Sequence, residues 1–234
     1  MKKFQLISNI ALMIAIIIGD ILYMTVGGLL IKSTASILFV LLGAVNLAIA
    51  LKNQTTLKKF CIIMTIGLFF AMLGDILLEI EFVVGAALFA VGHIFYFVAY
   101  CTLQKFELKN LIPSACIFVP SACLILFVKL FDFGGIFMQI VCLVYAAIIS
   151  LMVGKSISNL IKEKNILNIL LVVGSCLFFF SDFMLVFNVF AAVPRIFGIL
   201  CLSTYYPAEI VLAYSLNKTH TLQEEPIETE TTEN

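Results

Sequence analysis

The chain has 234 residues and no net charge, is 63% hydrophobic, and carries charged side chains at only 12% of its positions. Soluble domains carry about 25% charged residues, so this composition excludes an ordinary soluble protein. There is also no basic block, which argues against nucleic acid as a partner. Apolar stretches of about 20 residues, separated by short lysine-bearing loops, predict an all-α, polytopic protein embedded in the lipid bilayer.

The first apolar run follows the basic start Met1-Lys2-Lys3 and continues to Ile18 without a small-residue cleavage pattern. We therefore expect a retained first helix rather than a cleaved leader. Residues 217–234 are polar and rich in glutamate, so they are predicted to form a disordered cytoplasmic tail. The rest, residues 1–216, is predicted to be one transmembrane domain, a bundle of eight helices over residues 4–24, 34–51, 59–80, 83–103, 111–129, 135–155, 166–188 and 194–216.

The basic residues predict how the bundle is oriented. With eight spans both termini lie on the same side, and that side holds eleven of the 14 lysines and arginines. The other side holds Lys32, Lys129 and Arg195. Basic residues are enriched in cytoplasmic loops, so both termini are predicted to be cytoplasmic. The lysine-rich, arginine-poor composition also favours a bacterial cell membrane as the location.

Two aspartates lie deep inside apolar runs. Asp75 follows Gly74 in the third span, and Asp182 follows Ser181 in the seventh. A charged residue at the centre of a membrane helix costs roughly 2.5–3.5 kcal/mol on insertion scales, so such residues point to a functional site. Both spans run outward in the predicted topology, which places the two aspartates at similar depth in the outer half of the bundle.

Further polar side chains occur at compatible depth on the fourth and eighth spans, which run inward. Lipid cannot satisfy these groups, so we expect them to converge with the aspartates on the bundle interior. They are His93, Tyr96, Tyr205, Tyr206 and Glu209.

The remaining polar residues of the spans, and the cysteines, are interpreted as structural rather than functional. Asp20, near the end of the first span, is interpreted as a packing contact, and Glu79 and Glu81 as solvated positions at the outer boundary. The Gly-Asp-Ile-Leu sequence around Asp20 recurs around Asp75, through an internal repeat or through chance. The seven cysteines are scattered singly and are expected to behave as small apolar residues. No metal site or other cofactor is predicted, because neither a zinc motif nor a phosphate loop is present.

Segments from both halves of the chain resemble the signature of the YhhN-like lysoplasmalogenase family, and the resemblance covers residues 1–216. They are Leu73-Gly74-Asp75-Ile76-Leu77-Leu78, Phe82, Gly85, Phe89, Gly92-His93 and Tyr96, and then Phe180-Ser181-Asp182-Phe183-Met184-Leu185 and Tyr205-Tyr206. Two positions depart from the family pattern. Lys32 is followed by Ser33 where proline is usual, and Glu209 stands where the family tends to have glutamine.

The resemblance implies an integral membrane hydrolase, without a cofactor, that cleaves the vinyl ether bond of lysoplasmalogens. The lysophospholipid substrate would give a fatty aldehyde and glycerophosphoethanolamine or glycerophosphocholine. Asp75, Asp182 and His93 are then the expected catalytic residues. The expected substrate-binding residues are Lys32, Tyr96, Tyr205, Tyr206 and Glu209, with Lys32 steadying the phosphate.

A pair of aspartates suits this chemistry. A vinyl ether hydrolyses by protonation of an alkene carbon, which gives an oxocarbenium ion that water then attacks. One carboxyl group must supply the proton, and a second, ionised one stabilises the cation and activates water, much as in glycosidases. An apolar environment favours the protonated form that the acid requires.

Two other classes of function stay open. A small proton-coupled transporter would also bury carboxylates and use internal repeats, although only Pro120 and Pro207 interrupt the spans well inside them. A noncatalytic membrane scaffold would not require a buried histidine beside two aspartates.

Overall fold

The computed structural model describes residues 2–219, and the predicted eight-helix bundle is confirmed. Each long helix is long and apolar enough to cross a membrane, and hydropathy supports a multi-pass integral membrane protein. The predicted disordered tail lies mostly in residues 220–234, outside the described part of the chain. The helices are α1 (Lys2–Val26), α2 (Leu29–Lys52), α3 (Lys58–Leu78), α4 (Phe82–Leu103), α5 (Leu111–Phe127), α6 (Ile136–Lys162), α7 (Ile166–Phe190) and α8 (Ile196–Ser215), with short 3₁₀ helices η1 (Leu108–Asn110) and η2 (Leu216–Lys218).

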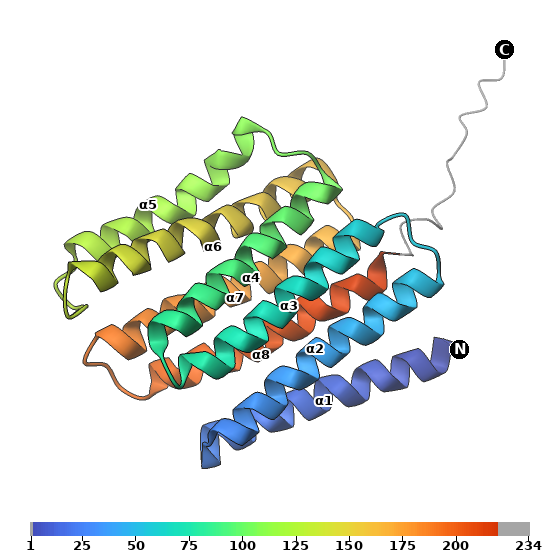
Figure 1. Ribbon diagram of the computed structural model, residues 1–234. Coiled ribbons are helices and arrows are strands. Elements are labelled where there is room, and N and C mark those ends of the chain that lie inside the picture. Colours follow the sequence, from blue (N-terminus) through green and yellow to red (C-terminus); the bar gives the residue numbers. More distant parts are fainter. Residues whose placement is uncertain (1, 220–234) are drawn as a thin grey trace.

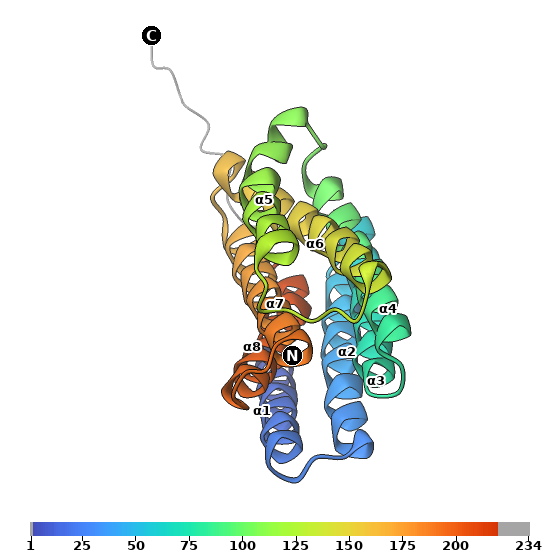
Figure 2. The same ribbon diagram turned by 90° about the vertical axis from the view of Figure 1, so that its left-hand side faces the viewer.

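Consecutive helices run in opposite directions and form a layered bundle (Figures 1 and 2). The α3–α4 and α7–α8 hairpins lie in the middle, while α1 and α5 lie at opposite edges. The start of α1 and the end of α8 lie at the same end of the bundle (Figure 1). Which side of the membrane that end faces stays a prediction from the basic residues.

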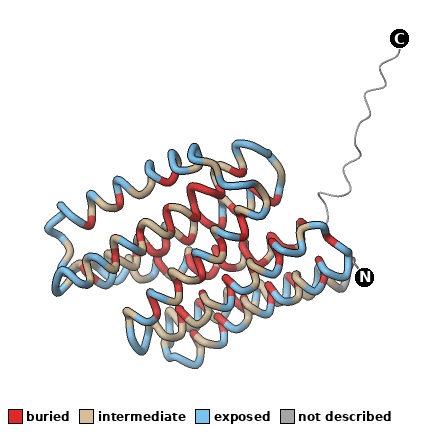
Figure 3. Tube along the Cα trace, turned by 45° about the horizontal axis from the view of Figure 1, so that its top comes forward, coloured by how far each residue is buried: buried red, intermediate tan, exposed pale blue. Residues whose placement is uncertain are grey.

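Buried positions concentrate on the inner helices, and exposed ones follow the outer faces (Figure 3). Large aliphatic side chains on the outer face of α1 are exposed at helical spacing, among them Ile7, Ile10, Ile14, Ile18 and Ile21. Lipid tails are as apolar as these side chains, so helix association here depends on close packing and on hydrogen bonds between helices.

Two helices, α2 and α6, extend farthest beyond their predicted limits. α2 begins at Leu29 rather than at residue 34, because Gly27 and Gly28 have φ angles of 76° and 103° and turn the chain directly from α1 into α2. α6 continues to Lys162 rather than ending at residue 155. Lys155 is buried on α6, where its Nζ donates to the Lys105 carbonyl at 3.1 Å and to Asn110 Oδ1 at 3.2 Å. A prediction from hydropathy ends the span at this charged residue. In the structure, the hydrogen bonds of Lys155 allow the helix to continue past it.

Gly85 permits the close approach of α3 and α4. A Cβ at this position would lie 2.5 Å from both the Cα and the amide nitrogen of Leu78, which are backbone atoms. We expect Gly85→Ala to destabilise the fold by roughly 1–3 kcal/mol and to lower its melting temperature in detergent. Gly43→Ala is the control, because the atom its Cβ would meet most closely is the movable end of the Leu68 side chain rather than backbone. Equal melting temperatures for the two variants would contradict this account of the α3–α4 contact.

Candidate active site

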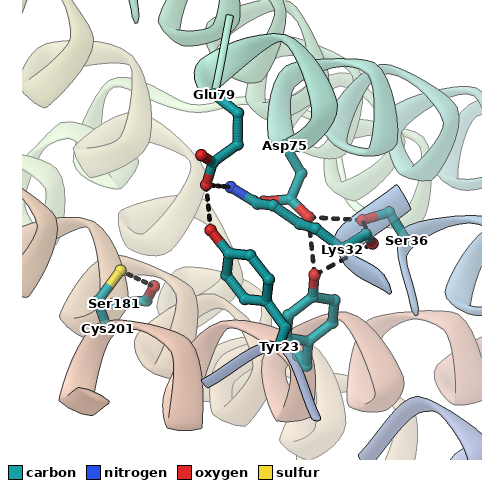
Figure 4. Close-up of polar contacts among 8 residues, drawn as sticks. Tyr23, Lys32, Ser36, Asp75, Glu79, Ser181 and Cys201 are labelled. Atoms are coloured by element: carbon teal, nitrogen blue, oxygen red, sulfur yellow. Dashed lines mark hydrogen bonds and ion pairs between the residues drawn. The ribbon is translucent and has the colours of Figure 1, made fainter. Parts of the chain in front are cut away.

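Asp75, near the end of α3, takes part in a buried ion pair and in two hydrogen bonds (Figure 4). Lys32 Nζ lies 3.2 Å from Asp75 Oδ1 and 3.0 Å from Glu79 Oε1. The other oxygen of Asp75 accepts hydrogen bonds from the Ser36 hydroxyl at 2.5 Å and from the Tyr206 hydroxyl at 3.0 Å. The i, i+4 spacing of Lys32 and Ser36 on α2, and of Asp75 and Glu79 on α3, places each pair on one helix face. Together these contacts stabilise Asp75 as a carboxylate.

The position of Lys32 differs from the expectation that it precedes the second span. It lies inside α2 and is only 4% exposed, because the Gly27-Gly28 turn starts the helix earlier. Its ammonium group is already paired with two carboxylates. The expected role of Lys32 in steadying a phosphate therefore stays a prediction, and its observed partners are Asp75 and Glu79.

Glu79 is not simply solvated, as we expected it to be. Its side chain is 39% exposed, but it pairs with Lys32 and accepts a hydrogen bond from the Tyr23 hydroxyl. Partial burial by itself would raise the pKa of Glu79, but the Tyr23 hydrogen bond and the Lys32 charge outweigh it, so this pKa lies below its ordinary value. Glu81 is exposed, and its carboxylate caps α4 by accepting from the Val84 amide at 2.6 Å.

A second polar group surrounds Asp182 on α7. The Tyr145 hydroxyl donates to Asp182 Oδ2 at 2.6 Å, and His93 Nε2 lies 2.8 Å from the Tyr145 oxygen and 3.4 Å from Asp182 Oδ2. A His93 ring protonated on Nε2 can donate to Tyr145, which in turn donates to Asp182; this tautomer is inferred from the network. Asp182 Oδ1 has no hydrogen-bond partner in the described part of the chain. Asp182 therefore keeps one oxygen without a hydrogen bond from these residues.

Sequence reasoning missed three residues of these groups: Tyr145, Ser36, and Tyr23, which bonds to Glu79. Tyr145 is the one tyrosine of α6, and its depth in the sixth span was the signal that could have identified it. Ser36 offered no comparable signal, because a serine inside a membrane helix commonly bonds to a carbonyl of the preceding turn. Ser36 does this too, through the Lys32 carbonyl at 2.9 Å.

Tyr96 and Glu209 form a third buried group. The Tyr96 hydroxyl donates to Glu209 Oε2 at 2.9 Å. Glu209 Oε1 and the Tyr205 hydroxyl are buried without a hydrogen-bond partner among residues 2–219. The structure thus divides the expected site residues into three groups: Tyr206 contacts Asp75, His93 contacts Asp182, and Tyr96 contacts Glu209.

One cavity of about 270 Å³ connects the first two groups. Such a space can hold several waters or a small polar group, because each water occupies about 30 Å³. Asp20 is buried on α1 but is not among the lining residues. The wall includes Lys32, Asp75, Glu79, Asp182, Cys201 and Tyr205.

The small residues beside Asp182 also belong to this region. Ser181 Oγ and Cys201 Sγ lie 3.5 Å apart, and both residues line the cavity (Figure 4). All seven cysteines are free thiols. Within residues 2–219, no three His, Cys, Asp or Glu side chains are grouped so as to hold a metal ion. The cavity presents two aspartates that can carry out acid–base chemistry. Asp75 is paired with the Lys32 cation, and Asp182 has one oxygen without a hydrogen bond.

Comparison with known proteins identifies the family. Neither the curated proteins nor the solved structures contain a significant match to this chain. The YhhN family model matches residues 28–216, which include α2 to α8 and both aspartate groups. The predicted resemblance is thereby confirmed, and the chain belongs to the YhhN family.

Proposed function

We propose that this protein is a lysoplasmalogenase, a hydrolase that releases a fatty aldehyde and glycerophosphoethanolamine or glycerophosphocholine from lysoplasmalogens. One observation carries the proposal: Asp75 and Asp182 line the same cavity in unlike environments. Acid–base catalysis needs carboxyl groups that differ in this way. The family membership supports the proposal, since the resemblance implies this reaction.

Asp182 is the general acid in this proposal. Its Oδ2 accepts the Tyr145 hydrogen bond, so a proton on the carboxyl group resides on the free Oδ1. That proton moves to the alkene carbon farther from the ether oxygen, and the π electrons form the new C–H bond. A lone pair of the ether oxygen then completes the oxocarbenium ion, and Asp182 is left as a carboxylate.

Asp75 is the carboxylate that stabilises the cation and activates water. As water adds to the oxocarbenium carbon, Asp75 accepts its proton and a hemiacetal forms. The hemiacetal then collapses: its hydroxyl proton goes to Asp182, and the departing glycerol oxygen takes the proton from Asp75. Both aspartates return to their starting states, and the sum of the steps is the addition of one water.

The test is turnover by the purified protein in detergent. We expect fatty aldehyde to be released from an alkenyl lysophospholipid without a sealed membrane. A transporter needs a sealed compartment for its activity. Proton movement in sealed vesicles together with no aldehyde in detergent would contradict the proposal and favour a proton-coupled transporter.

Tyr145 positions the acid, and its removal tests that role. Tyr145→Phe deletes the hydroxyl that bridges His93 and Asp182. We expect kcat to fall about 10–100-fold with little change in KM, because the substrate still binds but the acid is misplaced. Tyr100→Phe is the control, since the Tyr100 hydroxyl bonds to Ser175 at 2.9 Å, outside the cavity wall. Equal kcat values for the two variants would remove Tyr145 from the mechanism.

A further inference from the structure

A second pocket lies on the other side of Asp182 from the Lys32 ion pair. It is formed by α4, α5, α6 and α7, and its wall is almost wholly apolar. Asp182 is the one carboxyl group among its lining residues. Five residues line both this apolar pocket and the polar cavity: Leu78, Phe82, Phe89, Asp182 and Leu185.

We propose that the apolar pocket binds the alkyl chain of the substrate, and that the chain enters sideways from the bilayer between α5 and α7. The inference rests on the proposed function of the polar cavity and adds to it the direction in which the substrate lies. The glycerophosphate end occupies the polar cavity beside Lys32 and Asp75, and the chain extends past Asp182 into the apolar pocket.

The structure of a vinyl ether requires that the alkyl chain and the headgroup lie on opposite sides of the acid. The alkene carbon that receives the proton is bonded directly to the alkyl chain, and the neighbouring carbon is bonded to the ether oxygen. An acid that reaches this carbon therefore has the chain on one side and the polar headgroup on the other. Asp182 lies where two compartments of opposite polarity meet, as that geometry demands.

The packing of α5 leaves a route from the lipid. α5 packs extensively against α6, but in the described residues no comparable packing joins it to α4 or α7. The apolar wall includes Leu124 and Ile125 from α5 and Val186 from α7. A chain that leaves the bilayer between these helices remains among apolar side chains throughout.

Beside the pocket, the loop between α5 and α6 packs against the end of α7. The loop after α5 pairs with the end of α7 through a β-bridge between Phe131 and Ala191, and the Asp132 amide donates to the Phe190 carbonyl at 2.7 Å. The Phe131 ring packs against Phe187 at 5.0 Å between centroids, and Phe133 packs against Phe190 at 4.9 Å. These aromatic contacts occupy the loop side of the pocket, so the proposed entry is lateral, between α5 and α7.

Small side chains set the room available for the chain. Ala146 on α6 and Ala86 on α4 line the apolar pocket, and each is only 8% exposed. Ala146→Phe places a ring in the pocket. We expect it to lower kcat/KM at least tenfold for substrates with 8-carbon and with 16-carbon alkenyl chains, because the pocket of about 70 Å³ holds only the first carbons of either chain. Val144→Phe adds the same ring on the lipid-exposed side of α6 and should leave both values unchanged.

Photolabelling tests binding of the chain without requiring turnover. The probe is a 1-O-alkyl lysophosphocholine with a diazirine in its chain, which has no vinyl ether to hydrolyse. We expect the label on peptides of α5, α6 and α7, and we expect Ala146→Phe, but not Val144→Phe, to suppress it. Ala86→Leu obstructs the opposite wall and replaces Ala146→Phe if that variant fails to fold.

The outcomes separate this inference from the proposed function. Labelling of the pocket by a protein that releases no aldehyde would preserve the chain site and overturn the lysoplasmalogenase proposal. Aldehyde release with labelling elsewhere, and with an unchanged kcat/KM in Ala146→Phe, would overturn the chain site alone.

Discussion

Asp182→Asn and Asp75→Asn are each expected to lower kcat for lysoplasmalogen hydrolysis at least ~100-fold, because general acid–base catalysis contributes about 10²–10⁴-fold. Asparagine keeps the size of the side chain but can neither transfer the proton nor carry the charge. The measurement is steady-state aldehyde release by purified variants whose folding is checked by thermal melting. The double variant should be scarcely slower than the slower single one, since the two groups act as one unit.

Asp20→Asn is the matched control for these variants. Asp20 is also a buried aspartate within a membrane helix, but it does not line the cavity. It should retain nearly full turnover. If Asp75→Asn and Asp182→Asn fold and each keeps more than about a tenth of wild-type kcat, the proposed acid–base pair is wrong.

Lys32→Met is expected to destabilise the fold more than either Asp→Asn variant, because Asp75→Asn leaves Lys32 paired with Glu79, whereas Lys32→Met leaves both carboxylates without their cation. It removes the ammonium group that lies 3.2 Å from Asp75, and both side chains are almost fully buried. Breaking a buried ion pair by removing one partner costs about 3–5 kcal/mol, because the other charge is left without compensation. Turnover should fall as well, since an unpaired Asp75 is no longer stabilised as the carboxylate. Thermal melting in detergent and aldehyde release measure the two effects.

The double variant Lys32→Met/Asp75→Asn distinguishes a buried ion pair from a structural lysine. Asparagine needs no countercharge, so the double variant should recover much of the stability that Lys32→Met loses while staying inactive. Lys129→Met is the control, because Lys129 is exposed in the loop between α5 and α6. Additive losses of stability in the double variant would show that Lys32 and Asp75 do not depend on one another.

The helices and the aspartates could both be predicted from sequence because the membrane sets strict physical limits on which residues a span contains. Bilayer thickness fixes the length of each span, and a carboxyl group within a span is conspicuous because it is costly. Asp75, Asp182 and His93 can all be identified in this way. Their arrangement around a common cavity is a result of the structure.

The partners of those residues could not be predicted, because hydropathy does not fix how each helix is rotated about its axis. The Lys32–Glu79 pair joins α2 to the end of α3, and the Tyr145–Asp182 hydrogen bond joins α6 to α7, so each contact depends on how two helices face one another. The predicted start of α2 was wrong for a local reason. Its first turns contain Lys32, and a lysine in a polar run is typical of a loop until its buried carboxylate partners are known.

The most direct test of the proposed reaction compares an alkenyl lysophospholipid with its acyl analogue, each incubated with the purified protein in deuterated water. Aldehyde and free fatty acid are both measured by mass spectrometry. We predict aldehyde from the alkenyl lipid, with one deuterium on the carbon next to the carbonyl, and no fatty acid from the acyl analogue. Fatty acid release at a comparable rate, or no aldehyde from the alkenyl lipid, would contradict vinyl ether hydrolysis by the Asp75–Asp182 pair.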